Sequence, residues 1–163
     1  MPFTFPDTED SARAAVVVAA RDYDGVRYRH HGRTREQGLD CLGLVCATAW
    51  DLACKFNLKP SDNEYSAKNP DGYYLVERLR EEMVELPRWE LARVGDVVAC
   101  RWHITTPPQH LGIVTRREID LVRCVHASLK ARRVTEGMWP DLHLITHAFR
   151  IREVAALMEN PLG

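Results

Sequence analysis

The chain lacks the features that mark membrane proteins and nucleic-acid-binding proteins. No stretch approaches the ~20 consecutive apolar residues that a membrane-spanning helix requires. The 22 basic and 23 acidic residues leave a formal net charge of −1, whereas a general nucleic-acid-binding protein carries a strong positive excess. We therefore expect no membrane span and no nucleic-acid partner.

Cysteine usage gives no sign of a metal site. The chain has five cysteines, an odd number, and no C-x-x-C pair. Their spacings fit none of the usual zinc sites. We therefore expect no metal and no other cofactor.

The N-terminal residues lack the basic start of a secretory signal peptide, and Asp7, Glu9 and Asp10 follow at once. Such a start predicts synthesis in the cytoplasm, without export by the usual pathway. Structural disulfides are rare in that compartment.

What the chain does contain is a cysteine at the point where a loop turns into an apolar helix, in the stretch GLDCLGLV at residues 38–45. Asp40 is a good N-cap, because its carboxylate can accept from free backbone N–H groups of the first turn. Cys41 then takes the first helical position, where those N–H groups and the helix dipole favour the nucleophilic thiolate. The alternative is a small buried cysteine of the core.

Two predicted strands in the second half each carry a histidine. They are QHLGIVT at residues 109–115 and LVRCVHA at 121–127, separated by five polar residues of hairpin length. A turn centred near Glu118 would place His110 directly opposite His126, with Cβ atoms ~5 Å apart. One ring can then take the proton of the thiol while the other orients it. Two buried core histidines, or two metal ligands awaiting a third, are the alternatives.

Five ordered blocks resemble those of the NlpC-type cell-wall peptidases, the NlpC and p-sixty superfamily of papain-like cysteine peptidases. The blocks are GVRYR (25–29), LDCLGLV (39–45), GDVV (95–98), HLGI (110–113) and VHAS (125–128). The resemblance covers about residues 10–150. Such enzymes typically cut peptidoglycan stem peptides between D-glutamate and a diamino acid such as meso-diaminopimelate.

The resemblance implies a catalytic residue set. Cys41 would be the nucleophile, His110 the base and His126 the third, orienting residue. Tyr28 matches a tyrosine beside the nucleophile that helps to hold substrate or to stabilise the oxyanion. The backbone N–H of Cys41 would be the other oxyanion donor.

Two departures from the family pattern concern the helix start and the rim of the cleft. Leu42 stands where relatives usually have Ser, and His30-His31-Gly32 stands where they often have Trp-Gly-Gly. With Tyr28, we expect His30, His31 and Arg33 to contact substrate.

The RHHGR segment at residues 29–33 most resembles peptidases encoded in phage and prophage tail-gene clusters. We therefore expect action in the cell wall or periplasm, from a virion tail, with tail proteins as partners. Three alternatives stay open: a tail-tip structural or adaptor protein, an injected amidase toxin with an immunity protein, and an acyltransferase.

The order of predicted elements favours an α+β, papain-like fold in a single domain over residues 1–163. We expect helices near 8–23, 41–56 and 72–85, and a polar, turn-rich segment at 60–70. We expect five strands near 96–102, 110–115, 121–127, 132–135 and 145–151. The nucleophile helix would pack on the antiparallel sheet that carries the histidines.

Cys124 lies two residues before His126 on the same predicted strand. Since alternate residues share a face, we expect it near the site, opposite Gly112 and open to modification. Cys46 and Cys54 are expected in the core.

Overall fold

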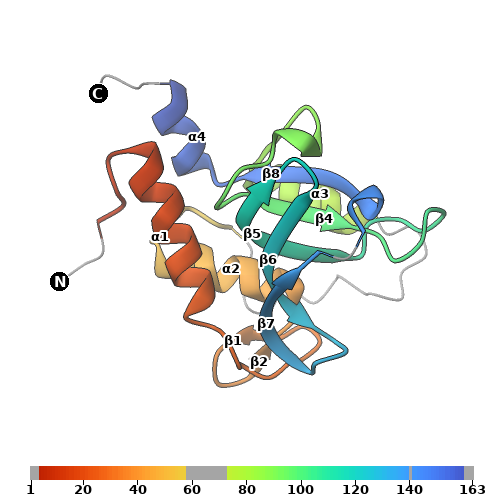
Figure 1. The fold of residues 1–163 in the computed structure, drawn as a ribbon. Helices are drawn as coiled ribbons and strands as arrows, with labels where there is room; N and C mark the ends of the chain where they lie inside the picture. The colour runs from red at the N-terminus through yellow and green to blue at the C-terminus, as the bar shows by residue number, and fades with distance from the viewer. Residues whose placement is uncertain (1–3, 58–72, 140, 160–163) are drawn as a thin grey trace.

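The computed structural model describes residues 4–57, 73–139 and 141–159 (Figure 1). The predicted segment at 60–70 lies outside these residues. The helices are α1 (Glu9–Arg21), α2 (Cys41–Asp51), α3 (Tyr73–Glu82) and α4 (Arg152–Glu159). The strands are β1 (Arg33–Thr34), β2 (Gly38–Leu39), β3 (Val84–Glu85), β4 (Val97–Cys100), β5 (His110–Glu118), β6 (Leu121–Ser128), β7 (Arg133–Met138) and β8 (Ile145–Arg150). Two short 3-10 turns, Trp89–Leu91 and Leu142–Leu144, complete the elements.

The main sheet is antiparallel throughout, with strand order β3-β8-β4-β5-β6-β7, and β1 and β2 form a separate pair. One face of the sheet packs against the helices, with residues such as Ile113 and Val125 in the larger core. The opposite face, which carries Val114 and Cys124, is covered by loops and the 3-10 turns. These layers confirm the predicted α+β class, with β3 as a sixth, edge strand.

Local signals set the helix boundaries. The Thr8 hydroxyl accepts from the Ser11 N–H at 3.3 Å, which places the start of α1 at Glu9 as expected. The second helix is shorter than predicted, because Ala53 adopts a left-handed φ of 53° and ends it. The sequence patterns predicted neither β3 nor α4.

The β5–β6 hairpin differs in register from the prediction. Glu118 pairs with Leu121, so the turn is centred on Ile119-Asp120, and an irregularity between Val114 and Arg116 inserts one residue. Ile113 therefore pairs with Val125, which sets His126 beside Gly112 and not directly opposite His110. The observed pairing of β5 with β6 at this end is therefore shifted by two residues from the predicted pairing. Because side chains alternate with a period of two, both histidines still project from the same face.

A buried ion triad joins the sheet to α1. Asp96, at the entry to β4, is fully buried. Its carboxylate accepts from the Arg13 guanidinium at 3.0 Å and from two nitrogens of Arg150 at 2.9 and 2.7 Å. It also accepts from the Arg93 N–H at 2.9 Å, so both carboxylate oxygens are used. Asp96 is thus a structural residue.

We predict that Asp96→Asn lowers the free energy of unfolding by about 3–5 kcal/mol, since it removes the buried counter-charge of Arg150 and leaves Arg13 paired with Glu9 alone. Chemical denaturation measures this loss. Asp22→Asn is the matched control, because the Asp22–Arg35 pair is solvent-exposed and contributes at most about 1 kcal/mol. Equal small losses in both variants would contradict the structural role of the triad.

Candidate active site

The N-terminus of α2 is built on Asp40, whose carboxylate is buried and accepts three hydrogen bonds. Oδ1 accepts from the Gly43 N–H and from Arg33 Nη1, both at 2.7 Å. Oδ2 accepts from the His31 N–H at 2.8 Å. Asp40 is therefore the N-cap that the sequence predicted, and it also fixes the preceding loop to the helix start.

Arg33 does not lie at the rim of a cleft, where the sequence analysis placed it. Its side chain is buried (2% exposed) and forms the ion pair with Asp40. The loop and helix approach so closely here that a Cβ on Gly43 would lie 1.9 Å from the carbonyl oxygen of Gly32. Because the Arg33 guanidinium faces this inner contact, it positions the start of α2 instead of facing substrate.

Cys41 is the first residue of α2 and is 5% exposed. The neighbouring Leu42 is also buried and faces the core. Tyr28 lies close by, because its segment forms a bridge with Leu39 just before the helix. Burial, with smaller contributions from the charges of Cys41 and Asp40, raises the pKa of Tyr28 to about 12. The phenol thus stays protonated near neutral pH and can donate a hydrogen bond to a developing oxyanion.

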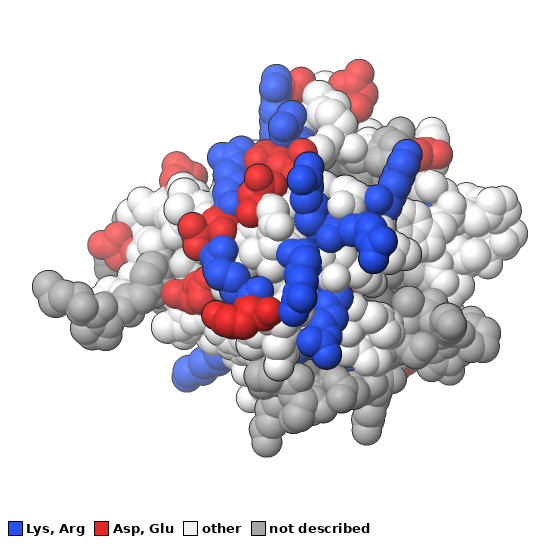
Figure 2. Space-filling model, turned by 90° about the horizontal axis from the view of Figure 1, so that it is seen from below, with Lys and Arg blue, Asp and Glu red and all other residues white. Residues whose placement is uncertain are grey.

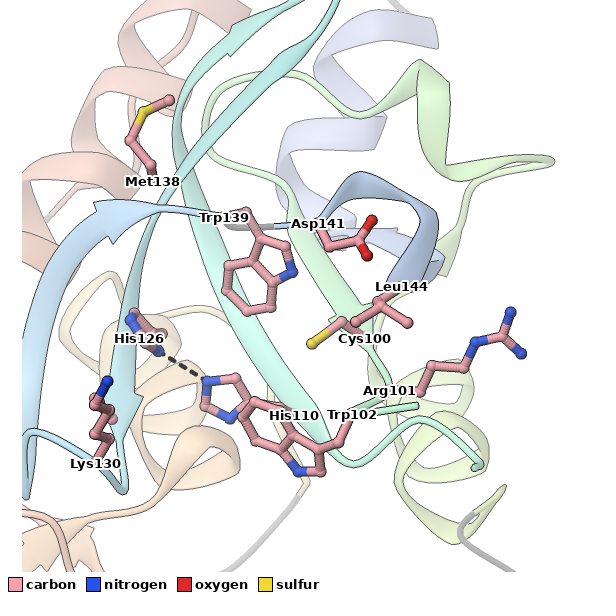
Figure 3. Close-up of a pocket in the computed structure, with 11 residues that line it drawn as sticks. Cys100, Arg101, Trp102, His110, His126, Lys130, Met138, Trp139, Asp141 and Leu144 are labelled. Carbon is pink, nitrogen blue, oxygen red and sulfur yellow. Dashed lines mark hydrogen bonds between the residues drawn. The ribbon is translucent and has the colours of Figure 1, made fainter. Parts of the chain in front are cut away.

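The two histidines form a hydrogen-bonded pair. His110 Nε2 lies 2.8 Å from His126 Nδ1, and the rings meet nearly edge to face, at 79° (Figure 3). Burial, and secondarily the charge of His126, lowers the pKa of His110 to about 3. Burial also lowers the pKa of His126. Two neutral rings can share this bond only if one donates, and an N–H on His110 Nε2 leaves its Nδ1 free to accept a proton.

Cys41, at the helix start, lies near enough to Cys100 for its charge to act on that thiol. Helix α2 packs against β5 and β6, the strands that carry His110 and His126. Burial raises the pKa of the Cys100 thiol, and the charge of Cys41 adds to the rise. Cys100 is the direct cross-strand partner of His110. The fold thus brings the predicted nucleophile, base and orienting residue into one region.

Two tryptophans flank the histidines, and the sequence analysis missed both. The buried ring of Trp139 lies 5.6 Å from both imidazoles, measured between ring centroids. Gly112 makes room for it, because a Cβ there would lie 2.6 Å from the indole. Trp102 stacks on His110 with centroids 5.1 Å apart and is 61% exposed. Gly112 lies two residues after His110 on the same face of the strand. In the sequence, this glycine was the feature that could have indicated a large aromatic side chain packed beside the histidines.

Cys124 is not open to modification, contrary to expectation. It is fully buried, and it belongs with Trp139 to the hydrophobic cluster on this face of the sheet. Burial raises the pKa of its thiol well above the ordinary value. A protonated, covered thiol is unreactive.

A cavity of about 310 Å³ opens beside the histidine pair. Figure 3 shows side chains from β4, β5, β6, β7 and the turns that follow them around it. It is lined by Cys100, Arg101, Trp102, His110, His126, Ser128, Lys130, Met138, Trp139, Asp141 and Leu144.

A second cavity, of about 400 Å³, lies at Tyr28 and is strongly basic. Its walls are Arg27, Tyr28, Arg29 and Arg132. Figure 2 views the molecule from below and shows a run of Lys and Arg side chains down the middle of that face, with acidic groups beside it. The turn between β6 and β7 contributes to both cavities, through Lys130 and Arg132.

His30 and His31 lie in the loop between Tyr28 and the helix start. Their rings are in contact, with centroids 3.8 Å apart. His31 adopts a left-handed φ of 60°, and its N–H holds Asp40. The structure thus gives His31 a supporting role, and substrate contact by either ring stays a prediction.

Three solved structures share this fold over most of the chain. The NlpC/p60 domain of the peptidoglycan hydrolase SagA superposes with a TM-score of 0.57 at 16% identity, over 85% of this chain and 98% of that one. The chain has the NlpC/p60 fold. A lipoprotein-like NLP/P60 protein of Staphylococcus aureus gives a TM-score of 0.60 at 16% identity, over 93% of this chain and 45% of that one. RipB, a peptidoglycan hydrolase of Mycobacterium tuberculosis, gives a TM-score of 0.58 at 18% identity, over 88% of this chain and 66% of that one.

The likeness to NlpC/p60 proteins lies in the arrangement of the chain more than in its residues. No family model matches the sequence, and no curated protein matches it either. Within the described residues, no group of His, Cys, Asp and Glu is arranged to hold a metal ion. No helix of that part of the chain is long and apolar enough to cross a bilayer.

The depressed pKa of His110 predicts a loss of stability in acid. The folded protein holds this ring neutral down to about pH 3, whereas the unfolded chain protonates it below about 6.5. Between these values the unfolded state binds more protons, so the free energy of unfolding falls as the pH drops. His110→Asn should reduce the slope of that fall, measured by urea denaturation between about pH 7 and 4.5.

His143→Asn is the control for this slope, because His143 is exposed and is not part of the histidine pair. An unchanged slope in His110→Asn, or an equal change in His143→Asn, would show that His110 is not held neutral by burial.

Proposed function

We propose that this protein is a cysteine peptidase that hydrolyses peptidoglycan stem peptides at the amide bond between D-glutamate and meso-diaminopimelate. The observation that carries the proposal is the His110–His126 hydrogen bond of 2.8 Å, on the two strands against which α2 packs. Two of the proteins with the same fold are described as peptidoglycan hydrolases, which supports this substrate class.

In the first step, the Cys41 sulfur attacks the scissile carbonyl carbon. His110 Nδ1 accepts the thiol proton, and the helix N-terminus favours the negative sulfur. The backbone N–H of Cys41 and the Tyr28 hydroxyl stabilise the oxyanion. Collapse of this intermediate breaks the C–N bond, and His110 delivers its proton to the departing amine.

In the second step, water attacks the Cys41 thioester. Neutral His110 takes a proton from that water, the C–S bond breaks, and the same proton returns to the thiolate sulfur. The products are a free D-glutamyl carboxylate and a free amine. Throughout, His126 Nδ1 accepts from His110 Nε2 and so keeps the tautomer and the ring orientation that both steps need.

Digestion of purified diaminopimelate-type peptidoglycan, read by mass spectrometry, tests the reaction. Wild type should release fragments split after D-glutamate, and Cys41→Ala should release none while keeping its fold. Cys46→Ala is the matched control, because this buried thiol lies one turn further along α2 and has no catalytic role here. Full hydrolysis by Cys41→Ala would refute the assignment of the nucleophile.

His126 should act through His110 and so change kcat more than KM. We predict that His126→Ala lowers kcat about 100-fold at an unchanged KM. His126→Asn should recover about tenfold of this loss, because an amide oxygen can accept from the same His110 N–H. Equal kcat values for the two variants would show that the hydrogen bond does not orient His110.

Association with a phage tail, with an immunity protein or with a given compartment stays a prediction from sequence.

A further inference from the structure

The direction of the substrate across the site follows from the position of the general acid. His110 must face the leaving amine in order to protonate it. The cavity lined by His110 and His126 is therefore on the leaving-group side. The basic cavity at Tyr28, beside the oxyanion donor, is on the acyl side.

The leaving-group cavity has mainly apolar walls. Trp102 and Trp139 flank the histidines, and Met138 and Leu144 complete the wall. Trp102 and Met138 are more than half exposed, although both are large and apolar. Walls of this kind fit the methylene groups of a straight aliphatic side chain, since burial of each CH₂ is worth about 0.8 kcal/mol.

The charge at this cavity comes from Lys130. Figure 3 shows the Lys130 ammonium directed toward the histidine pair, whereas the Arg101 guanidinium and the Asp141 carboxylate point away from it. The Asp141 carboxylate is already used, because it accepts from the His143 N–H at 2.9 Å. Among the described residues, the Lys130 ammonium has no ion-pair partner. An aliphatic chain that reaches this end of the cavity would thus meet a positive charge.

We propose that this cavity binds the side chain of the diamino acid on the leaving-group side, and that Lys130 selects a side chain ending in a carboxylate over one ending in an ammonium alone. The proposal rests on the proposed function and identifies the residue that distinguishes diaminopimelate-type from lysine-type stem peptides. A terminal carboxylate pairs with Lys130, whereas the side-chain ammonium of lysine is repelled by it.

The test compares two synthetic peptides, L-Ala–γ-D-Glu–meso-diaminopimelate and L-Ala–γ-D-Glu–L-Lys, as substrates. Wild type should favour the first by about tenfold or more in kcat/KM. Lys130→Glu should reverse this preference, and Lys130→Arg should retain it. The ratio of the two kcat/KM values does not depend on how much of a variant is folded. The control is Lys55→Glu, which makes the same charge change at an exposed position in another part of the chain.

A binding measurement separates this proposal from the proposed function. Free meso-diaminopimelate is titrated into Cys41→Ala and Cys41→Ala/Lys130→Glu and followed by NMR, with weaker binding expected in the double variant. Hydrolysis with a preference ratio that Lys130→Glu leaves unchanged would overturn the role of Lys130 alone. Lys130-dependent binding without hydrolysis of either peptide would overturn the peptidase function but support the cavity. The absence of both hydrolysis and binding would overturn the peptidase function and the cavity proposal together.

Discussion

The site depends on one buried carboxylate. Asp40 caps α2, pairs with Arg33 and holds the His31 N–H, so a single side chain joins the preceding loop to the first turn of the helix. A buried charge is costly unless it is paired and hydrogen-bonded. Here the helix N–H group and the guanidinium supply that compensation, and Cys41 is fixed as the next residue.

The histidine pair shows the complementary constraint. Burial favours the uncharged imidazole of His110, so the ring begins without a proton. The same burial would leave ring nitrogens unsatisfied, and the hydrogen bond to His126 supplies a partner. Trp139 packs beside both rings, and it fits only because Gly112 lacks a side chain. The charge state and the tautomer of His110 therefore depend on a few contacts along β5 and β6.

Much of this arrangement could be predicted from local sequence. Asp40 before an apolar run specifies the helix start, and the alternation of strand residues places His110 and His126 on one face. That placement survived a wrong register, because a two-residue slip keeps the parity of every side chain.

Long-range packing accounts for what could not be predicted. The burial of Arg33 depends on the loop folding back onto α2, and the covering of Cys124 depends on Trp139, which arrives from beyond β7. The edge strand β3 is two residues long and carries too little pattern to detect.

The central claim is that His110 activates Cys41, and site-resolved alkylation tests it without any substrate. Iodoacetamide at neutral pH, followed by mass spectrometry of each cysteine peptide, gives the rate at Cys41 beside the four other buried cysteines. We predict that Cys41 reacts at least about tenfold faster than any of them, and that His110→Asn removes most of this advantage. A Cys41 that reacts no faster than Cys46, or a rate that is unchanged in His110→Asn, would contradict the catalytic role of this site.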